Sequence, residues 1–320
     1  MIERGTTSLA AALLWAATLL APAARRLVAP SPDAIPGLSY TMTVTTTPHG
    51  AAPAPAPAPA SSGAQKVIAR VTEAAGRGRI DVLEGTFGAG FGKGDYMLFD
   101  STEFVIVRPG SKEFTPVPGG LETKSIEMLQ SLPGVQLTVA NVKVSLDTIR
   151  RVDTIEGLPT RHYRLAIAYD IALDAGVMKE TIGTSVQSDF WMADLPGFPP
   201  TPFSQVTAGT GGGGASGGAG GSGALKELVA KVNSATAALH RGVPLKSVSL
   251  SRMTEGAGPP TEMEQTNVVS DYMPAMVDAS RLMLPSGYTA APMPGMENFP
   301  GATVSDDAGA KWRVRPGKTP

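Results

Sequence analysis

The stretch that decides the fold is HYRLAIAYDI, residues 162–171. From Tyr163 to Ile171 every second residue is a tyrosine, leucine or isoleucine, and the residues between them are smaller or more polar. Successive side chains of a strand point to opposite faces of a sheet, so this alternation predicts a strand with one apolar face. The segment 181–192 carries apolar residues in the same phase and is its predicted partner.

The same period of two residues recurs on both sides of this pair. Turn residues separate the short alternating segments, which is typical of antiparallel hairpins, and the chain is rich in them, with 37 glycines and 28 prolines among 320 residues. Further strands are predicted at residues 40–46, 67–71, 80–82, 96–98, 104–106, 135–146, 245–254 and 261–272. The sequence therefore predicts a mainly β fold (α+β) built on an antiparallel sheet.

One of these strands changes phase in its middle. Its apolar residues occupy odd positions up to Val139 and even positions from Val142 onward. One extra residue near Ala140-Asn141, a β-bulge, would produce this change. Because a bulge bends its strand and increases the local twist, we expect a strongly curved sheet.

Two segments have the period of a helix. Residues 224–240 carry apolar side chains at spacings of three and four, and Gly242-Val243-Pro244 follows them. This pattern predicts an amphipathic helix that lies on an apolar surface. A second, shorter helix is predicted at 122–132, before Pro133-Gly134.

Two low-complexity segments interrupt the chain. Residues 51–60 read AAPAPAPAPA, which predicts an extended, stiff spacer, and residues 209–223 are a glycine-rich, flexible insert. Neither segment contributes to a core, so both are predicted to be insertions in a single domain, 37–290. Residues 291–320 are predicted to be a flexible C-terminal tail.

The first 23 residues have the pattern of a secretory signal peptide. A short polar start is followed by an apolar segment and then by Ala21-Pro22-Ala23, which fits a cleavage site. The alternative is an uncleaved membrane anchor, with Arg25-Arg26 directly after it. Export predicts a periplasmic or secreted protein, and because the chain has no cysteine its fold must be held by its core.

Composition argues against several classes of function. The net charge is −1, so no global electrostatic field attracts nucleic acid. With no cysteine and three histidines, we expect neither a metal site nor another cofactor.

His162 lies on the more polar face of its strand, and no motif places a nucleophile and a base around it. The sequence therefore predicts a non-enzymatic protein, with a hydrolase as a remote alternative.

Methionines are concentrated near the C-terminus. Seven of the 13 methionines lie in the last 70 residues, at positions 253, 263, 273, 276, 283, 293 and 296. Methionine fills irregular cores and also recurs on adaptable binding surfaces. Both interpretations, core filling and an apolar groove for a ligand or partner, stay open.

The order of several short motifs resembles that of a known family. The segment Gly157–Tyr163 leads into a predicted strand, and Asp189–Asp194, which reads DFWMAD, belongs to the next predicted strand. Gly242–Ser247 begins a further strand, and Leu284–Tyr288 reads LPSGY. Between Gly37 and Tyr288 the chain thus resembles the outer-membrane lipoprotein-carrier superfamily, in an uncharacterised exported bacterial branch. The resemblance implies an incomplete barrel, or half-barrel, whose concave apolar face is covered by one or two helices. In the carriers that cavity holds the acyl chains of a lipoprotein.

Residue pattern and resemblance together suggest a binding region between the sheet and the 224–240 helix. Six residues repeat toward one face and are the candidate lining of a cavity for a lipid or other hydrophobic ligand: Tyr163, Leu165, Ile167, Phe190, Leu228 and Val232. The alternative is that these six side chains fill the hydrophobic core and line no cavity. The alternative function is an envelope scaffold with no small ligand, which would contact an envelope protein partner. Contact with a membrane is expected only through an uncleaved N-terminal segment.

Overall fold

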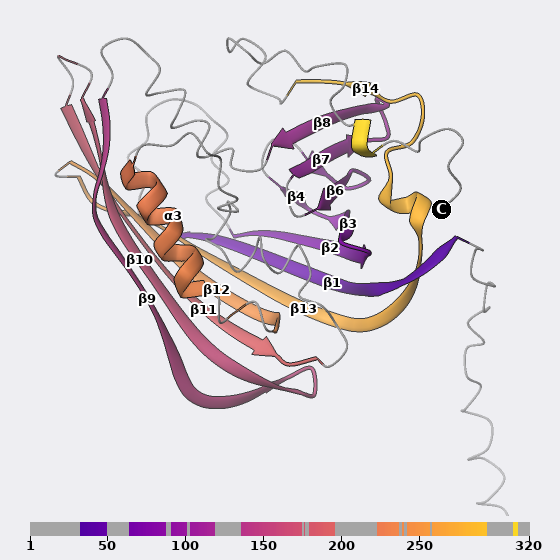
Figure 1. Ribbon diagram of the computed structural model, residues 1–320, viewed down its shortest axis with the longest axis horizontal. Coiled ribbons are helices and arrows are strands. Elements are labelled where there is room, and N and C mark those ends of the chain that lie inside the picture. Colours follow the sequence, from indigo (N-terminus) through magenta and orange to yellow (C-terminus); the bar gives the residue numbers. More distant parts are fainter. Residues whose placement is uncertain are drawn as a thin grey trace, which may run out of the picture. The chain divides into compact units, whose positions relative to one another are not determined.

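A computed structural model gives the fold (Figure 1). The structure describes residues 33–49, 64–87, 91–100, 103–118, 136–174, 176, 179–195, 223–236, 239, 242–256, 258–292 and 310–312. The chain divides into two units, Met1–Pro32 and Asp33–Pro320, and all described residues belong to the second. The predicted signal segment 1–23, the proline spacer 51–60, the helix at 122–132 and nearly all of the glycine-rich insert lie outside the described residues.

The described residues form one large sheet of twelve strands in the order β14-β8-β7-β6-β3-β2-β1-β13-β12-β11-β10-β9. Neighbouring strands are antiparallel except for β14 and β8, which are parallel. The strands are β1 (Ala34–His49), β2 (Gln65–Ala74), β3 (Arg77–Glu84), β6 (Tyr96–Asp100), β7 (Glu103–Arg108), β8 (Glu113–Pro118), β9 (Gln136–Ile155), β10 (Leu158–Asp174), β11 (Lys179–Ala193), β12 (Val243–Glu255), β13 (Thr261–Asp278) and β14 (Thr289–Ala290). A separate two-stranded sheet pairs β4 (Thr86–Phe87) with β5 (Phe91–Gly92).

Two meanders make up the large sheet. One runs from β1 through β8, the other from β9 through β13, and the first and last of these strands, β1 and β13, join them. This seam extends from the pair Ala34 and Asp278 to the pair His49 and Glu262. The outer strands β9 and β14 are not paired with each other, so the sheet is open, and the prediction of a mainly β fold with a curved antiparallel sheet is confirmed.

Bulges bend the long strands. The predicted bulge in β9 is confirmed: the register between β9 and β10 shifts beside Ala140, and Asn141 has a φ of 55°. A second shift occurs between Arg161 and His162, and on β13 the register shifts at Asp271, whose φ is 53°. Because each bulge increases the twist of its strand, β9 to β13 curve around one face, which is the concave face in Figure 1.

Helix α3 (Gly223–Thr236) lies on this concave face, against β9 and β10 (Figure 1). Its buried side chains include Leu228 and Val232, one turn apart, while Glu227 and Lys231 form an ion pair on its exposed side. The described helix ends at Thr236, whose hydroxyl donates to the carbonyl of Val232, and the rest of the predicted range to 240, apart from Leu239, lies outside the described residues. It begins at Gly223, the last residue of the predicted flexible insert.

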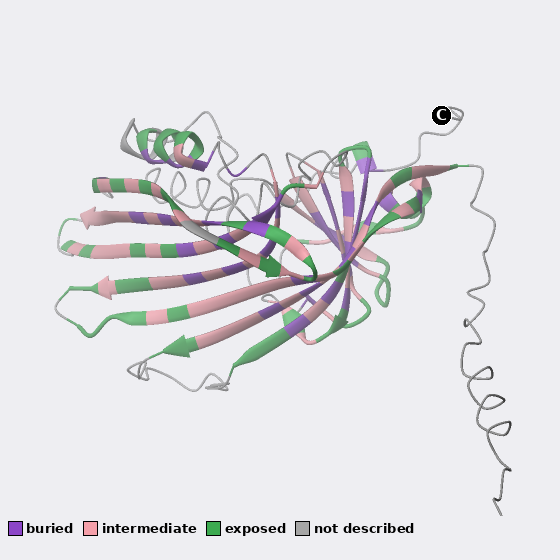
Figure 2. Cartoon of the chain, turned by 90° about the horizontal axis from the view of Figure 1, so that it is seen from below, coloured by how far each residue is buried: buried purple, intermediate pink, exposed green. Residues whose placement is uncertain are grey.

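The core occupies both faces of the sheet. On the concave side a large cluster combines Met42, Val71 and Leu245 with residues of β3 and β6. On the other side Leu98, Val105 and Phe114 are covered by Leu284 and by Trp312 of the short helix η4 (Ala310–Trp312). Figure 2 shows that buried positions gather where the strands converge, while the distal ends of the long strands are more exposed.

The position of Trp312 differs from the prediction of a flexible tail. Its side chain is fully buried, its indole donates a hydrogen bond to the carboxylate of Glu103, and its carbonyl accepts one from the amide of Leu284. Residues 310–312 are therefore part of the packed domain. The other residues of the predicted tail, apart from Ala291 and Pro292, lie outside the described residues.

Candidate functional site

The six residues predicted to line a site lie together beneath α3. On the sheet, Tyr163 is the register partner of Phe190, and Leu165 and Ile167 follow on the same face of β10. From the helix, Leu228 and Val232 complete the cluster. The alternation in 162–171 and the helical spacing in 224–240 thus predicted the correct faces.

These side chains form a packed cluster. Leu165, Ile167, Phe190 and Val232 are at most 3% exposed and Leu228 is 9% exposed, while Tyr163 is partly exposed at the margin. Their contacts are with one another and with β9. A ligand at this position would therefore have to displace α3 or lie beside it.

Beyond the cluster, the concave face becomes progressively more exposed along the long strands. Tyr169, Ile171, Ile182 and Val186 share the face of Ile167 and are partly exposed. Two methionines continue it: Met253 lies beside Thr184, and Met263 lies beside Ser251. They are 46% and 47% exposed, so an apolar strip, interrupted by Thr184 and Ser251, runs from the core out to solvent.

A stripe of small polar side chains crosses the same face between the two apolar clusters. Ser188 and Ser249 share a hydrogen bond of 2.8 Å, and Asn267 donates to Ser247 at 3.0 Å. Their registers place all four on the concave face, because Ser247 pairs with Phe190, Ser249 with Ser188, and Asn267 with Ser247. The sequence analysis missed this stripe, although serines at positions 247, 249 and 251, two residues apart, were a signal of it.

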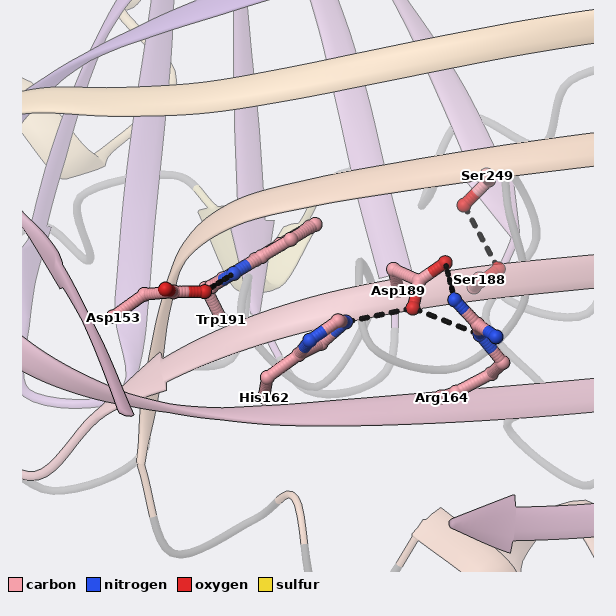
Figure 3. A network of polar contacts seen from close by, with 7 residues as sticks. All are labelled: Asp153, His162, Arg164, Ser188, Asp189, Trp191 and Ser249. Atoms are coloured by element: carbon pink, nitrogen blue, oxygen red, sulfur yellow. Dashed lines mark hydrogen bonds and ion pairs between the residues drawn. The ribbon is translucent and has the colours of Figure 1, made fainter. Parts of the chain in front are cut away.

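The opposite, convex face carries a network of charged and aromatic side chains (Figure 3). Nε2 of His162 lies 2.7 Å from Oδ1 of Asp189, and the same carboxylate accepts hydrogen bonds from Arg164 at 3.0 and 3.3 Å. The imidazole stacks on the indole of Trp191, with ring centroids 4.4 Å apart. That indole donates to Asp153 at 2.9 Å.

His162 lies on the more polar face of its strand, as the alternation predicted, and there it is buried and paired with Asp189. Asp189 supplies the carboxylate that would orient a histidine base. Ser188, the residue before Asp189, points to the opposite face of the sheet and shares a hydrogen bond with Ser249 (Figure 3). The contacts described for His162 are a hydrogen bond to Asp189 and a ring stack on Trp191, which join the neighbouring strands β10 and β11.

A hollow of ≈ 370 Å³ lies farther along the convex face. It is lined by residues that include Lys143, Asp170 and Arg252, and it lies beside the bulge residue Asn141, which donates to Asp170 at 2.6 Å. Gly183 is the register partner of Asp170 and has no side chain to fill the space. The bulge and the glycine together account for the depression.

A buried carboxylate lies at the other end of the concave face. Glu73 is 3% exposed and accepts a hydrogen bond of 2.6 Å from the hydroxyl of Tyr40, whose ring stacks on that of Tyr272. Burial, and secondly the negative charge of Glu73, raise the pKa of the Tyr272 phenol well above its usual range. The phenol of Tyr272 is therefore held in its neutral form.

Comparison with protein-family profiles and with curated proteins gives no match for this chain. Among the described residues, no helix has the length and apolar character needed to cross a membrane. Nor do the residues that the structure describes contain a cluster of three or more histidine, aspartate or glutamate side chains suited to a metal ion.

Proposed function

We propose that this chain is an exported, non-enzymatic protein that binds the hydrocarbon part of a lipid on the concave face of its sheet, beside α3. One observation carries the proposal: the apolar strip on that face begins in the packed cluster and ends at the exposed side chains of Met253 and Met263. Covering apolar surface stabilises a complex by about 25 cal/mol per Å². An extended acyl chain fits a strip of this kind better than a compact ligand does.

The residue types on the strip suit a flexible ligand. Methionine side chains adapt to irregular apolar shapes, which is why they recur on surfaces that accept more than one ligand. The neighbouring serine, glutamine and asparagine side chains supply donors and acceptors for an ester or a head group. The concave face therefore offers apolar contacts for a hydrocarbon chain and polar contacts for its head group.

Two features of the sequence support the same function. The N-terminal segment 1–23 has the pattern of a secretory signal, and the order of motifs from Gly37 to Tyr288 resembles that of the lipoprotein carriers. In those carriers acyl chains lie between a curved sheet and helices. Here the corresponding region is the concave face with α3.

The first test is native mass spectrometry of the protein purified from an exported preparation, followed by organic extraction. We expect the measured mass to be that of a chain that starts near Ala24, together with a bound adduct in the mass range of a lipid. A processed protein that carries no adduct and does not bind a fluorescent fatty acid would refute lipid binding. A mass that includes residues 1–23 would show that the segment is retained.

The second test uses a matched pair of methionines on β13. Met263 and Met273 are 47% and 42% exposed, but Met263 faces the concave side and Met273, the register partner of Ser39, faces the other side. We expect Met263→Glu to weaken binding of the fluorescent fatty acid and Met273→Glu to leave it unchanged. Equal effects of both substitutions would place the ligand elsewhere.

An interaction protein without a small ligand is the second candidate. It is favoured by the close packing of the six predicted lining residues, because a ligand would need an open space that this cluster does not offer. For such a protein, both methionine variants would behave like the wild type, and the extraction would recover no lipid.

A further inference from the structure

The outer edge of β9 is the feature that the proposed function does not use. β9 spans 20 residues and is the last strand of the sheet, so one row of its backbone groups has no partner among the strands that the structure describes. An unpaired strand edge of this length is a ready template for pairing with another strand.

Two irregularities limit the part of this edge that can pair. The register between β9 and β10 shifts beside Asn141 and again between Ile149 and Val152. Between these shifts, residues 143–149 pair regularly with β10. Because bulges interrupt a regular edge, only this central window can accept another strand.

The charges inside this window lack partners within the described part of the chain. Lys143 and Asp147 are exposed and lie on the convex face, and neither forms an ion pair or a side-chain hydrogen bond there. Asp147 is the register partner of Arg164, but Arg164 donates to Asp189 on the other neighbouring strand.

We propose that this edge pairs with the same edge of a second copy of the chain, antiparallel and centred on Ser145. In that register Lys143 of each copy lies opposite Asp147 of the other, so two ion pairs form across a two-fold axis. In a parallel, in-register arrangement Lys143 would face Lys143 and Asp147 would face Asp147, and the like charges would repel. The charge pattern thus selects a closed dimer and disfavours open-ended stacking.

The concave side of the window fits the same register. Val144 and Leu146 are partly exposed at the margin of the cluster beneath α3. In the dimer Val144 of one copy lies beside Leu146 of the other, so apolar side chains that are now partly exposed become covered. The inference does not depend on lipid binding.

The test is sedimentation velocity over a range of protein concentrations at low salt, with charge-reversal variants. We expect the wild type to dimerise, and we expect Lys143→Asp and Asp147→Lys each to weaken dimerisation by about tenfold or more, since two attractive pairs become repulsive. The control is Lys93→Asp, an exposed lysine in a turn away from β9, which should dimerise like the wild type.

Mixing the two single variants gives the most specific readout. Lys143→Asp presents two aspartates and Asp147→Lys presents two lysines, so an equimolar mixture should form a heterodimer with near wild-type affinity. The double variant Lys143→Asp/Asp147→Lys should also recover dimerisation. A wild type that stays monomeric, single variants that dimerise like the wild type, or a mixture that does not recover would each overturn the proposal.

Discussion

His162 and Asp189 are hydrogen-bonded at 2.7 Å between β10 and β11, with side chains that are only 11% and 14% exposed. The chain contains a second pair of the same chemistry, His49 and Glu264, at 3.5 Å, in which the side chains are 45% and 43% exposed. Both pairs join a histidine to a carboxylate and differ in exposure, so comparing the stability of variants at the two sites isolates the effect of burial.

Substitution His162→Ala should lower the free energy of unfolding by about 1–3 kcal/mol, because it leaves the Asp189 carboxylate with fewer partners and removes the stack on Trp191. Substitution His49→Ala should change it by less than about 0.5 kcal/mol, since an exposed pair contributes little. Urea denaturation of both variants measures the difference. Similar losses in both would contradict the structural role assigned to His162.

Substitution Trp312→Ala should cost about 3–5 kcal/mol, as expected for a large aromatic side chain removed from a core. The neighbouring substitution Lys311→Ala removes two partly exposed ion pairs, with Asp100 and Glu103, and should cost about 1 kcal/mol or less. Thermal or urea unfolding of the two variants provides the comparison. If Trp312→Ala were as stable as Lys311→Ala, the C-terminal helix η4 would not be part of the domain in solution.

Substitution Gly78→Ala should destabilise the sheet strongly, because a Cβ at this position would lie 2.0 Å from the ring of Phe99. Gly110 also has ordinary backbone geometry and no atom within 4 Å of its would-be Cβ, so Gly110→Ala is the matched control and should be nearly neutral. Soluble yield and the urea midpoint report both effects. Adding Phe99→Leu to Gly78→Ala should recover part of the loss.

Stability should fall as the pH rises above about 10, in part because of Tyr272. Burial raises the pKa of this phenol in the folded protein, so above pH 10 the unfolded chain loses the proton while the folded chain keeps it. The unfolded state then binds fewer protons, and the free energy of unfolding decreases by at most about 1.4 kcal/mol per pH unit for one such group.

The variant Tyr272→Phe should reduce this slope between pH 9 and pH 11. Some slope should remain, because burial also raises the pKa of Tyr96. Urea denaturation at several pH values measures the slope. An unchanged slope in the variant would mean that Tyr272 ionises in the folded protein as readily as in the unfolded chain.

Much of the sheet could be predicted because its signals are local. The alternation in 162–171 identified the apolar face of β10, and the change of phase after Val139 located the bulge at Asn141 before any pairing was known. Each signal depends only on the direction of successive side chains along one strand. The same reasoning placed Leu228 and Val232 on the buried side of α3.

The pairings between distant segments could not be predicted in this way. Nothing in the residues around Trp312 indicates that it covers Leu98 and Phe114, because that contact depends on where the chain returns to the sheet. The partner of His162 was hidden for the same reason, since Asp189 becomes its neighbour only through the register of β10 and β11. Local pattern identifies a face, whereas the register between strands identifies the partner.

The seam between β1 and β13 also determines when the domain can fold. β1 is the first described strand, and Asp278, the register partner of its first residue Ala34, lies near the end of the domain. The contacts in the middle of the sheet therefore join residues far apart in the sequence. Folding is expected to be slow, because a long loop must close before these contacts form. A ribosome-bound chain can form the first meander early, but one side of β1 stays unpaired until β13 has been synthesised. The complete sheet can therefore assemble only after β13 has been synthesised, and until then the unpaired edge of β1 is a site at which the nascent chain can aggregate.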